Sequence, residues 1–145
     1  MTEPKNSLPD CTIFWLAKAY QKAHGDFKEV LKPYGLTNLQ HLVLEGLWYQ
    51  EGQTAAELGK MLVLDKATLS GVLDRMHENG WIAKRRDPDD RRVVRLFPAP
   101  KAESCKTELI ALRRDANEAL LADFSMEEQV LLKRMLKDLT GIAVG

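Results

Sequence analysis

The chain lacks an apolar run near the roughly 20 residues that a helix needs to cross a membrane. Its first residues, MTEPKNSLPD, have no basic segment leading into an apolar one, as a secretory signal would. Cysteine is scarce, and Cys11 and Cys105 follow neither a metal-binding nor a CxxC spacing. The three histidines show no metal spacing either. We therefore expect a cytoplasmic protein without membrane contact, metal, cofactor or structural disulfide.

The patterns of common enzyme classes are also missing. The sequence has no nucleophile–base arrangement, glycine-rich phosphate loop or metal cluster, and Ser70-Gly71 does not sit in a nucleophile elbow. A length of 145 residues, with 45% hydrophobic and 29% charged residues, suits one globular domain. We expect a single domain over 1–145 that is not an enzyme.

Net positive charge is absent from the whole chain but present in one segment. The formal net charge is zero, yet six of the twelve residues from 84 to 95 are Lys or Arg. They are Lys84, Arg85, Arg86, Arg91, Arg92 and Arg95. A basic segment on a neutral body favours a protein that binds DNA at one place, and a solvated hairpin is the alternative.

Helix start signals divide the chain. Ser7-Leu-Pro-Asp10 predicts a helix that runs to about Lys32 and is apolar on more than one face, which indicates contact with a second subunit. Capping-box patterns open three later helices, at Thr37/Gln40, Thr54/Glu57 and Ser125/Glu128. A further long helix is expected from about 99–102 to about Ala122.

The segment from Leu62 to Pro98 has the most specific pattern. Asp65 is the expected cap of a helix that ends at Asn79-Gly80, with Leu69, Val72, Leu73 and Met76 facing inward and small polar residues on its outer first turns. A tight turn joins it to the preceding helix, in which Gly59 is expected to allow close approach. Two short strands, 81–84 and 92–97, flank an Asp-Pro turn. This is a helix-turn-helix followed by a charged hairpin wing.

Four segments in this order resemble the MarR family of transcriptional regulators. They are YGLTNLQ (34–40), TAAELG (54–59), LDKATLSGVLDR (64–75) with NGWI (79–82), and RRDPDDRR (85–92). The resemblance implies a mainly α fold with a small β-hairpin wing, a winged helix-turn-helix dimerised through its N- and C-terminal helices. Segments 7–34 and 101–143 would form the homodimer, and 36–98 the DNA-binding lobe. It further implies a repressor that binds a pseudo-palindromic operator in double-stranded DNA.

Carried over by position, the family's DNA contacts fall on nine residues. They are Thr54, Lys66, Ala67, Thr68, Ser70, Arg75, Asp90, Arg91 and Arg92. Lys66 to Ser70 would read bases, and Arg75 and the helix capped by Thr54 would meet phosphates. Asp90 would orient Arg92 for the minor groove, a task that Arg91 is equally placed to perform. Asp87 and Asp89 are expected to fold back onto Arg85 or Arg86.

The segment LFPAPK (96–101) departs from the family, which usually places a Thr cap here. The first turn of the following helix is therefore the least certain part of the predicted fold.

Two modes of control follow from the resemblance. A small phenolic or lipophilic effector would bind between the dimer helices and the DNA-binding lobe, in a crevice lined by Phe14, Trp15, Tyr20, His24, His41 and Trp48, unless these residues are plain core. Alternatively, LDKATLS is similar to the branch that senses organic hydroperoxides, which points to Cys11, although the branch's cysteine position matches Ile13 here. A winged helix used only for protein contact is a further, less favoured reading.

Overall fold

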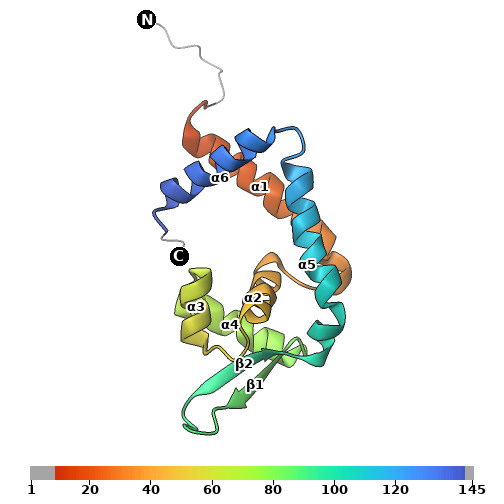
Figure 1. Ribbon diagram of the computed structural model, residues 1–145, viewed down its shortest axis with the longest axis vertical. Coiled ribbons are helices and arrows are strands. Elements are labelled where there is room, and N and C mark those ends of the chain that lie inside the picture. The colour runs from red at the N-terminus through yellow and green to blue at the C-terminus, as the bar shows by residue number, and fades with distance from the viewer. Residues whose placement is uncertain (1–8, 143–145) are drawn as a thin grey trace, which may run out of the picture.

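A computed structural model describes residues 9–142 of the chain (Figure 1). Its elements, in chain order, are α1 (Thr12–Leu31), the 3-10 turn η1 (Lys32–Tyr34), α2 (Asn38–Tyr49), α3 (Ala55–Leu62), α4 (Lys66–Glu78), β1 (Ile82–Arg86), β2 (Val94–Pro98), α5 (Pro100–Leu120) and α6 (Met126–Thr140). Helices α1 and α6 lie at one end, α2–α4 and the hairpin lie at the other, and α5 connects the two (Figure 1). No helix among the described residues is long and apolar enough to span a bilayer.

Helix α1 begins later than the sequence pattern predicted. Ser7 lies outside the described residues, and the N-cap is Cys11 in an extended conformation, without a side-chain cap. Asp10 does not cap the helix, because its carboxylate accepts a hydrogen bond from the Trp15 indole at 2.7 Å. The end of the helix agrees with the prediction, since the chain tightens into η1 at Pro33 and turns at Gly35 with φ +67°.

The helix caps explain most of the other boundaries. The predicted capping boxes at Thr37/Gln40 and Ser125/Glu128 are both complete. At Thr54 only half of the predicted box forms. The Thr54 hydroxyl accepts from the Glu57 backbone N–H, but the Glu57 carboxylate accepts from that hydroxyl instead of the Thr54 backbone. Helix α5 starts at Ala99 without a side-chain cap, with Pro100 in its first position.

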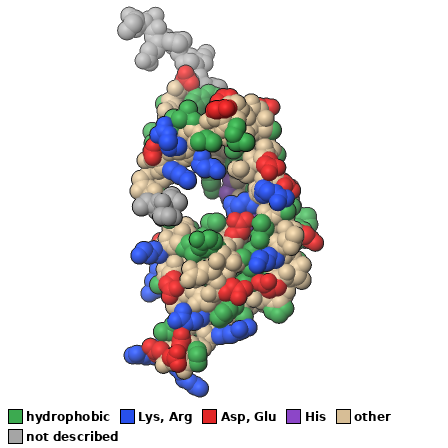
Figure 2. Space-filling model, in the orientation of Figure 1, with side chains coloured by type: hydrophobic (Ala, Val, Ile, Leu, Met, Phe, Trp, Pro, Cys, Tyr) green, Lys and Arg blue, Asp and Glu red, His purple; other side chains and the backbone are tan. Residues whose placement is uncertain are grey.

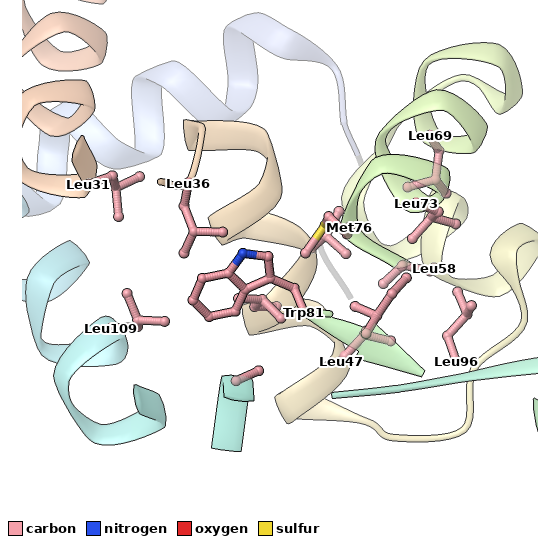
Figure 3. Packing of buried hydrophobic residues seen from close by; sticks show 14 of the residues in the cluster. Leu31, Leu36, Leu47, Leu58, Leu69, Leu73, Met76, Trp81, Leu96 and Leu109 are labelled. Carbon is pink, nitrogen blue, oxygen red and sulfur yellow. The ribbon is translucent and has the colours of Figure 1, made fainter. Parts of the chain in front are cut away.

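One apolar core holds the lobe of residues 36–98 together and ties it to the long helices (Figure 3). Leu69, Leu73 and Met76 of α4 are buried, as predicted, and Val72 packs at the edge. Leu31 of α1 and Leu109 of α5 enter the same cluster, so the lobe does not pack alone. At about 25 cal/mol per Å² of buried apolar surface, such contacts supply the main favourable free energy of folding.

The hairpin is antiparallel, with Arg85 opposite Arg95. Its strands are shifted from the predicted ranges. Trp81 precedes β1, where its N–H donates to Met76 O and its C=O accepts from the Ala99 N–H. Arg92 and Val93 belong to the turn, because the Val93 N–H donates to Asp90 O.

Candidate nucleic-acid interface

The α3–α4 turn sets the position of the recognition helix, α4. Val63 adopts a left-handed conformation with φ 56°, which a β-branched residue rarely does. A Cβ on Gly59 would lie 3.3 Å from Leu64 O and from a Leu69 methyl. The predicted role of Gly59 is therefore confirmed, since a larger residue would push α3 away from the turn.

Asp65 begins α4 with two hydrogen bonds to the same residue. Its carboxylate accepts from the Thr68 N–H at 2.8 Å and from the Thr68 hydroxyl at 2.7 Å. The backbone bond and then the hydroxyl bond hold the pKa of Asp65 below its usual value. The Thr68 hydroxyl is thus already engaged in the cap and offers a base only its lone pairs.

The outer face of α4 is open to solvent. Lys66, Ala67, Ser70 and Arg75 are exposed, and none of their side chains forms a hydrogen bond with another described residue. Thr54 is half-buried at the start of α3, where its hydroxyl serves the helix cap. With Thr68, six predicted contact residues therefore lie in the helix-turn-helix, and the unengaged polar groups belong to α4.

At the wing tip, the Asp90 carboxylate accepts three hydrogen bonds from Arg92, one from its backbone N–H and two from its guanidinium. Arg92 Nε lies 3.1 Å from Oδ1 and Nη2 lies 3.3 Å from Oδ2, and these bonds lower the pKa of Asp90. The Arg92 side chain is nevertheless 91% exposed. Arg91 is also exposed, and its carbonyl accepts from Arg86 Nη1 at 3.0 Å. Lys and Arg side chains project from this end of the molecule (Figure 2).

The prediction that Asp87 folds back onto Arg85 or Arg86 is wrong. Asp87 accepts from Arg95 Nε at 2.6 Å, and Arg95 also donates to Gly52 O at 2.9 Å. The bond from Arg95, followed by backbone bonds from the turn, lowers the pKa of Asp87. Asp87 and Arg95 meet because both side chains lie on the same side of the twisted hairpin, on the side facing the α2–α3 loop. Arg95 therefore braces the wing against the lobe.

The other wing residues also differ from expectation. Arg85 lies over the Phe97 ring, with its guanidinium carbon 4.6 Å from the centroid. Asp89 forms no ion pair with Arg85 or Arg86, and it is held by its own N–H, which donates to Asp87. Lys84 is paired with Asp74 of α4 at 3.0 Å. Arg85 and Arg86 are exposed as well, so within the basic segment Arg95 alone is half-buried.

Comparison with known proteins agrees with this geometry. Residues 36–94 match the model of the MarR family. The HTH-type transcriptional regulator YsmB of Bacillus subtilis, itself uncharacterized, is 30% identical over 112 residues, which are 77% of each chain. A probable transcriptional regulator from Pseudomonas aeruginosa has a crystal structure with TM-score 0.82 and 30% identity, covering 90% of this chain and 97% of that one.

The chain belongs to the MarR family. It is a winged-helix transcriptional regulator and not an enzyme. A cysteine-to-serine mutant of Escherichia coli MarR, solved with operator DNA, is similar at TM-score 0.79 and 25% identity, covering 87% of this chain and 91% of that one. The resemblance read from the four sequence segments is thereby confirmed.

In this MarR-family chain, the predicted effector residues do not share one site. A crevice of about 810 Å³ between α1, α2 and α5 is lined by Tyr20 and His24. It does not include the other four. Phe14 and Trp15 pack edge to face on α1, His41 is fully buried, and Trp48 donates to Glu103. The structure separates them because side chains of one helix point to different sides.

Sequence reasoning missed the polar groups of the crevice. Its lining includes Asn38 and Arg113, and both Asn38 Oδ1 and Arg113 Nε are buried without a hydrogen bond to any residue of the described range. An arginine placed among Leu109, Leu112 and Ala116, the apolar positions of α5, was the available signal. A buried polar atom without a partner requires an explanation, and a crevice with apolar walls and a few such polar groups is a candidate ligand site.

Neither cysteine is paired. Cys11 is exposed at the start of α1, and Cys105 is half-buried with its sulfur 3.7 Å from Ser104 Oγ. Ile13, at the family's cysteine position, is 80% exposed. Cys11 and Ile13 therefore both face solvent in the single chain.

Proposed function

We propose that this regulator binds a pseudo-palindromic operator as a homodimer and represses transcription until a small effector releases it. The observation that carries the proposal is the combination of two surfaces on one chain. One is the recognition helix and wing described above. The other is an apolar surface on α1 and α6 that no described residue covers.

The apolar surface supports the homodimer. No residue of α6 is buried, yet Leu131, Met135 and Leu139 form a stripe at i, i+4 and i+8 and are 46%, 47% and 62% exposed. On α1, Ile13 and Tyr20 are 80% and 65% exposed. Contiguous apolar surface of this kind is costly in water and marks an interface. A two-fold dimer would present two recognition helices about one DNA turn apart.

The crevice between α1, α2 and α5 supports control by an effector. Phe27, Leu39, Leu42 and Leu120 give it apolar walls, and Arg113 gives it a cation. Lys22 also lines it but is paired with Asp26 at 3.0 Å. A small aromatic molecule with a polar or acidic group fits these walls, and it would bind where the lobe meets the long helices.

Selection of duplexes from a random pool tests the central proposal. We expect enrichment of an inverted repeat with half-sites about ten base pairs apart, and a steep fall of affinity with salt. Recovery of single half-sites would contradict dimeric reading. If no duplex is retained at low salt, the wing serves a protein contact instead.

Control by Cys11 is the alternative to an effector. It is favoured by one observation, the exposure of the Cys11 side chain at the end of a helix. Treatment of the protein–DNA complex with an organic hydroperoxide should leave the complex intact if an effector controls it. Release that a Cys11→Ser variant abolishes would support the redox alternative, and phenolic acids added to the same assay test the effector.

A further inference from the structure

A group of three ionisable residues, one of them buried and two half-buried, lies where the DNA-binding lobe meets α5. His41 and Glu45 come from α2, one turn apart, and Arg113 comes from α5. We call these three residues the junction cluster. His41 is fully buried, and the side chains of Glu45 and Arg113 are 27% and 38% exposed. The function proposed above does not use His41 or Glu45.

The geometry determines which nitrogen of His41 carries the proton. Nε2 lies 2.6 Å from Leu109 O, so it must donate to that carbonyl. Nδ1 then has a lone pair, which faces Arg113 Nη2 at 3.3 Å and accepts from it. Neutral His41 therefore joins α2 to α5 twice, as a donor to the Leu109 backbone and as an acceptor from Arg113.

Glu45 forms an ion pair with Arg113, but the geometry of this contact is poor. Its Oε1 lies 3.2 Å from Arg113 Nε without the alignment of a hydrogen bond, and 3.6 Å from His41 Nδ1. The guanidinium also stacks on Phe27 of α1, 4.9 Å from the ring centroid. Phe27 in turn meets His41 edge to face at 5.0 Å. Three helices thus share one guanidinium.

We propose that the junction cluster is a proton-sensitive connection between α2 and α5, in which one added proton detaches Arg113 from α2. A proton from solvent on His41 Nδ1 removes the lone pair that accepts from Arg113 and turns that N–H toward Glu45. A proton on Glu45 instead removes the negative charge that holds Arg113. Either placement weakens the same contact, so the consequence does not depend on which residue takes the proton.

The surroundings keep the cluster at one negative and one positive charge near neutral pH. Burial is the main reason that the pKa of His41 lies below its usual value. The hydrogen bond to Leu109 O opposes this shift, and the nearby positive charge of Arg113 adds to it. Burial also raises the pKa of Glu45, against the attraction of Arg113. Glu45 lines a surface pocket whose walls also contain Lys106 and Arg114 of α5 and Lys133 of α6. From α1, Lys22 and Asp26 neutralise each other.

The α2–α5 connection lies next to the elements proposed to bind DNA. Helix α2 packs against α3, α4 and β2, which carry or support the recognition helix and the wing. A change in the α2–α5 contact therefore changes how the lobe is held on α5. We expect DNA affinity to fall on acidification, by roughly tenfold between pH 7.5 and 5.5, a typical strength of coupling between two sites.

The first test needs no DNA, so it remains informative even if the proposed operator function fails. The chain has three histidines, and His24→Gln and His77→Gln variants assign their NMR signals. We expect the His41 ring signal to titrate below the ordinary histidine pKa, and the Arg113 Nε–H signal to change over the same pH range. In an Arg113→Gln variant the His41 titration should move to higher pH. A His41 signal that titrates without any response of Arg113 overturns the proposal.

The second test uses the selected duplex and a His77→Gln background, because His77 is an ionisable residue on α4 itself. A His41→Gln change keeps an amide donor for Leu109 O and an oxygen acceptor for Arg113, but takes up no proton. We expect the DNA affinity of the background protein to fall between pH 7.5 and 5.5, and that of the His41→Gln protein to stay unchanged. The same loss in both proteins would overturn the proposal. If His41→Gln does not fold, Arg113→Gln is the second test variant. We expect it to bind the duplex with low affinity at both pH 7.5 and pH 5.5.

Discussion

Two adjacent arginines at the wing tip have different environments. Arg92 is oriented by Asp90 through two hydrogen bonds, whereas the Arg91 side chain forms none with a described residue. A fixed guanidinium loses less conformational entropy on binding than a mobile one. Arg92 is therefore the better candidate for insertion into the minor groove, and Arg91 for a phosphate contact.

We predict that Arg92→Ala lowers affinity for the selected duplex by about tenfold or more and reduces the salt slope by about one. Asp90→Asn should give part of this loss, because it leaves the arginine charge but not its orientation. Fluorescence anisotropy across a salt series measures both quantities. Arg91→Ala is the matched control, with a similar change in slope and a smaller loss of affinity. Equal losses would remove the distinction between the two residues.

Ser70 and Thr68 also differ, although both are exposed hydroxyl residues of α4. The Thr68 hydroxyl is engaged by Asp65, while the Ser70 hydroxyl is unengaged within the described chain. We predict that Ser70→Ala lowers the ratio of specific to non-specific affinity and leaves non-specific binding unchanged. Thr68→Val should change that ratio less. Competition between the selected duplex and a scrambled one measures it, and a uniform loss with Ser70→Ala would argue against base reading.

At the scale of elements, the start of α5 lacks the cap found at α2, α3, α4 and α6. Ala99 has the extended conformation of an N-cap but no side-chain oxygen. We predict that Ala99→Ser stabilises the protein by about 1 kcal/mol, by accepting from an N–H of the first turn. Urea denaturation measures the change, with Ala99→Gly as a control that adds no acceptor. No gain with serine would mean that burial of Ala99, which is 7% exposed, leaves no room for the hydroxyl.

The elements were predictable where one local signal sufficed. The inward face of α4, the Asp65 cap and the close approach at Gly59 followed from spacing and residue type alone. The start of α1 did not, because Asp10 bonds the Trp15 indole instead of a helix amide. Likewise, Trp81 lies outside β1 because its backbone bridges Met76 and Ala99. Such competing partners are set by tertiary structure.

The candidate sites divide in the same way. The recognition helix and wing are continuous in sequence, so their residues were found from one segment. The crevice and the junction cluster combine residues about 70 positions apart, as in the contact of His41 with Arg113. Spacing within one helix carries no information about such pairs. Tyr20 and His24 of the crevice and His41 of the junction cluster were named beforehand, but Asn38, Glu45 and Arg113 were not.

At the scale of the whole molecule, the uncovered stripe on α6 should determine assembly. We predict that Met135→Asp converts a dimer into monomers, because a carboxylate there would be buried at the interface without a partner. Sedimentation velocity measures the change. Lys137→Gln is the matched control, with the same change in net charge on the opposite side of the helix, and should stay dimeric. A dimeric Met135→Asp protein would mean that this stripe is not the interface.

Stability against pH tests the junction cluster through the whole fold. The folded pKa of His41 is lowered, so above the unfolded value near 6.5 both states are neutral and His41 adds no pH dependence. Below that value the unfolded chain takes up a proton that the folded chain resists, so the free energy of unfolding falls with pH. Glu45 has the opposite sign, because its raised folded pKa favours the folded state as pH falls toward 4.5. We therefore predict a loss that begins near pH 6.5 and levels off toward pH 5.

Urea denaturation at fixed protein concentration, at pH 7.5, 6.5 and 5.5, measures this loss. In His41→Gln the decline between 6.5 and 5.5 should disappear, and in Glu45→Gln the levelling toward pH 5 should disappear while the decline remains. His24→Gln and His77→Gln should behave as wild type, since both side chains are exposed. Three aspartates with lowered pKa values, at positions 65, 87 and 90, lose their stabilising bonds only as the pH falls below about 4. If the free energy of unfolding of His41→Gln still declines between pH 6.5 and 5.5, the decline must arise outside both the junction cluster and these aspartates. That result would mean that the protonation of the junction cluster does not control the stability of the fold in this range.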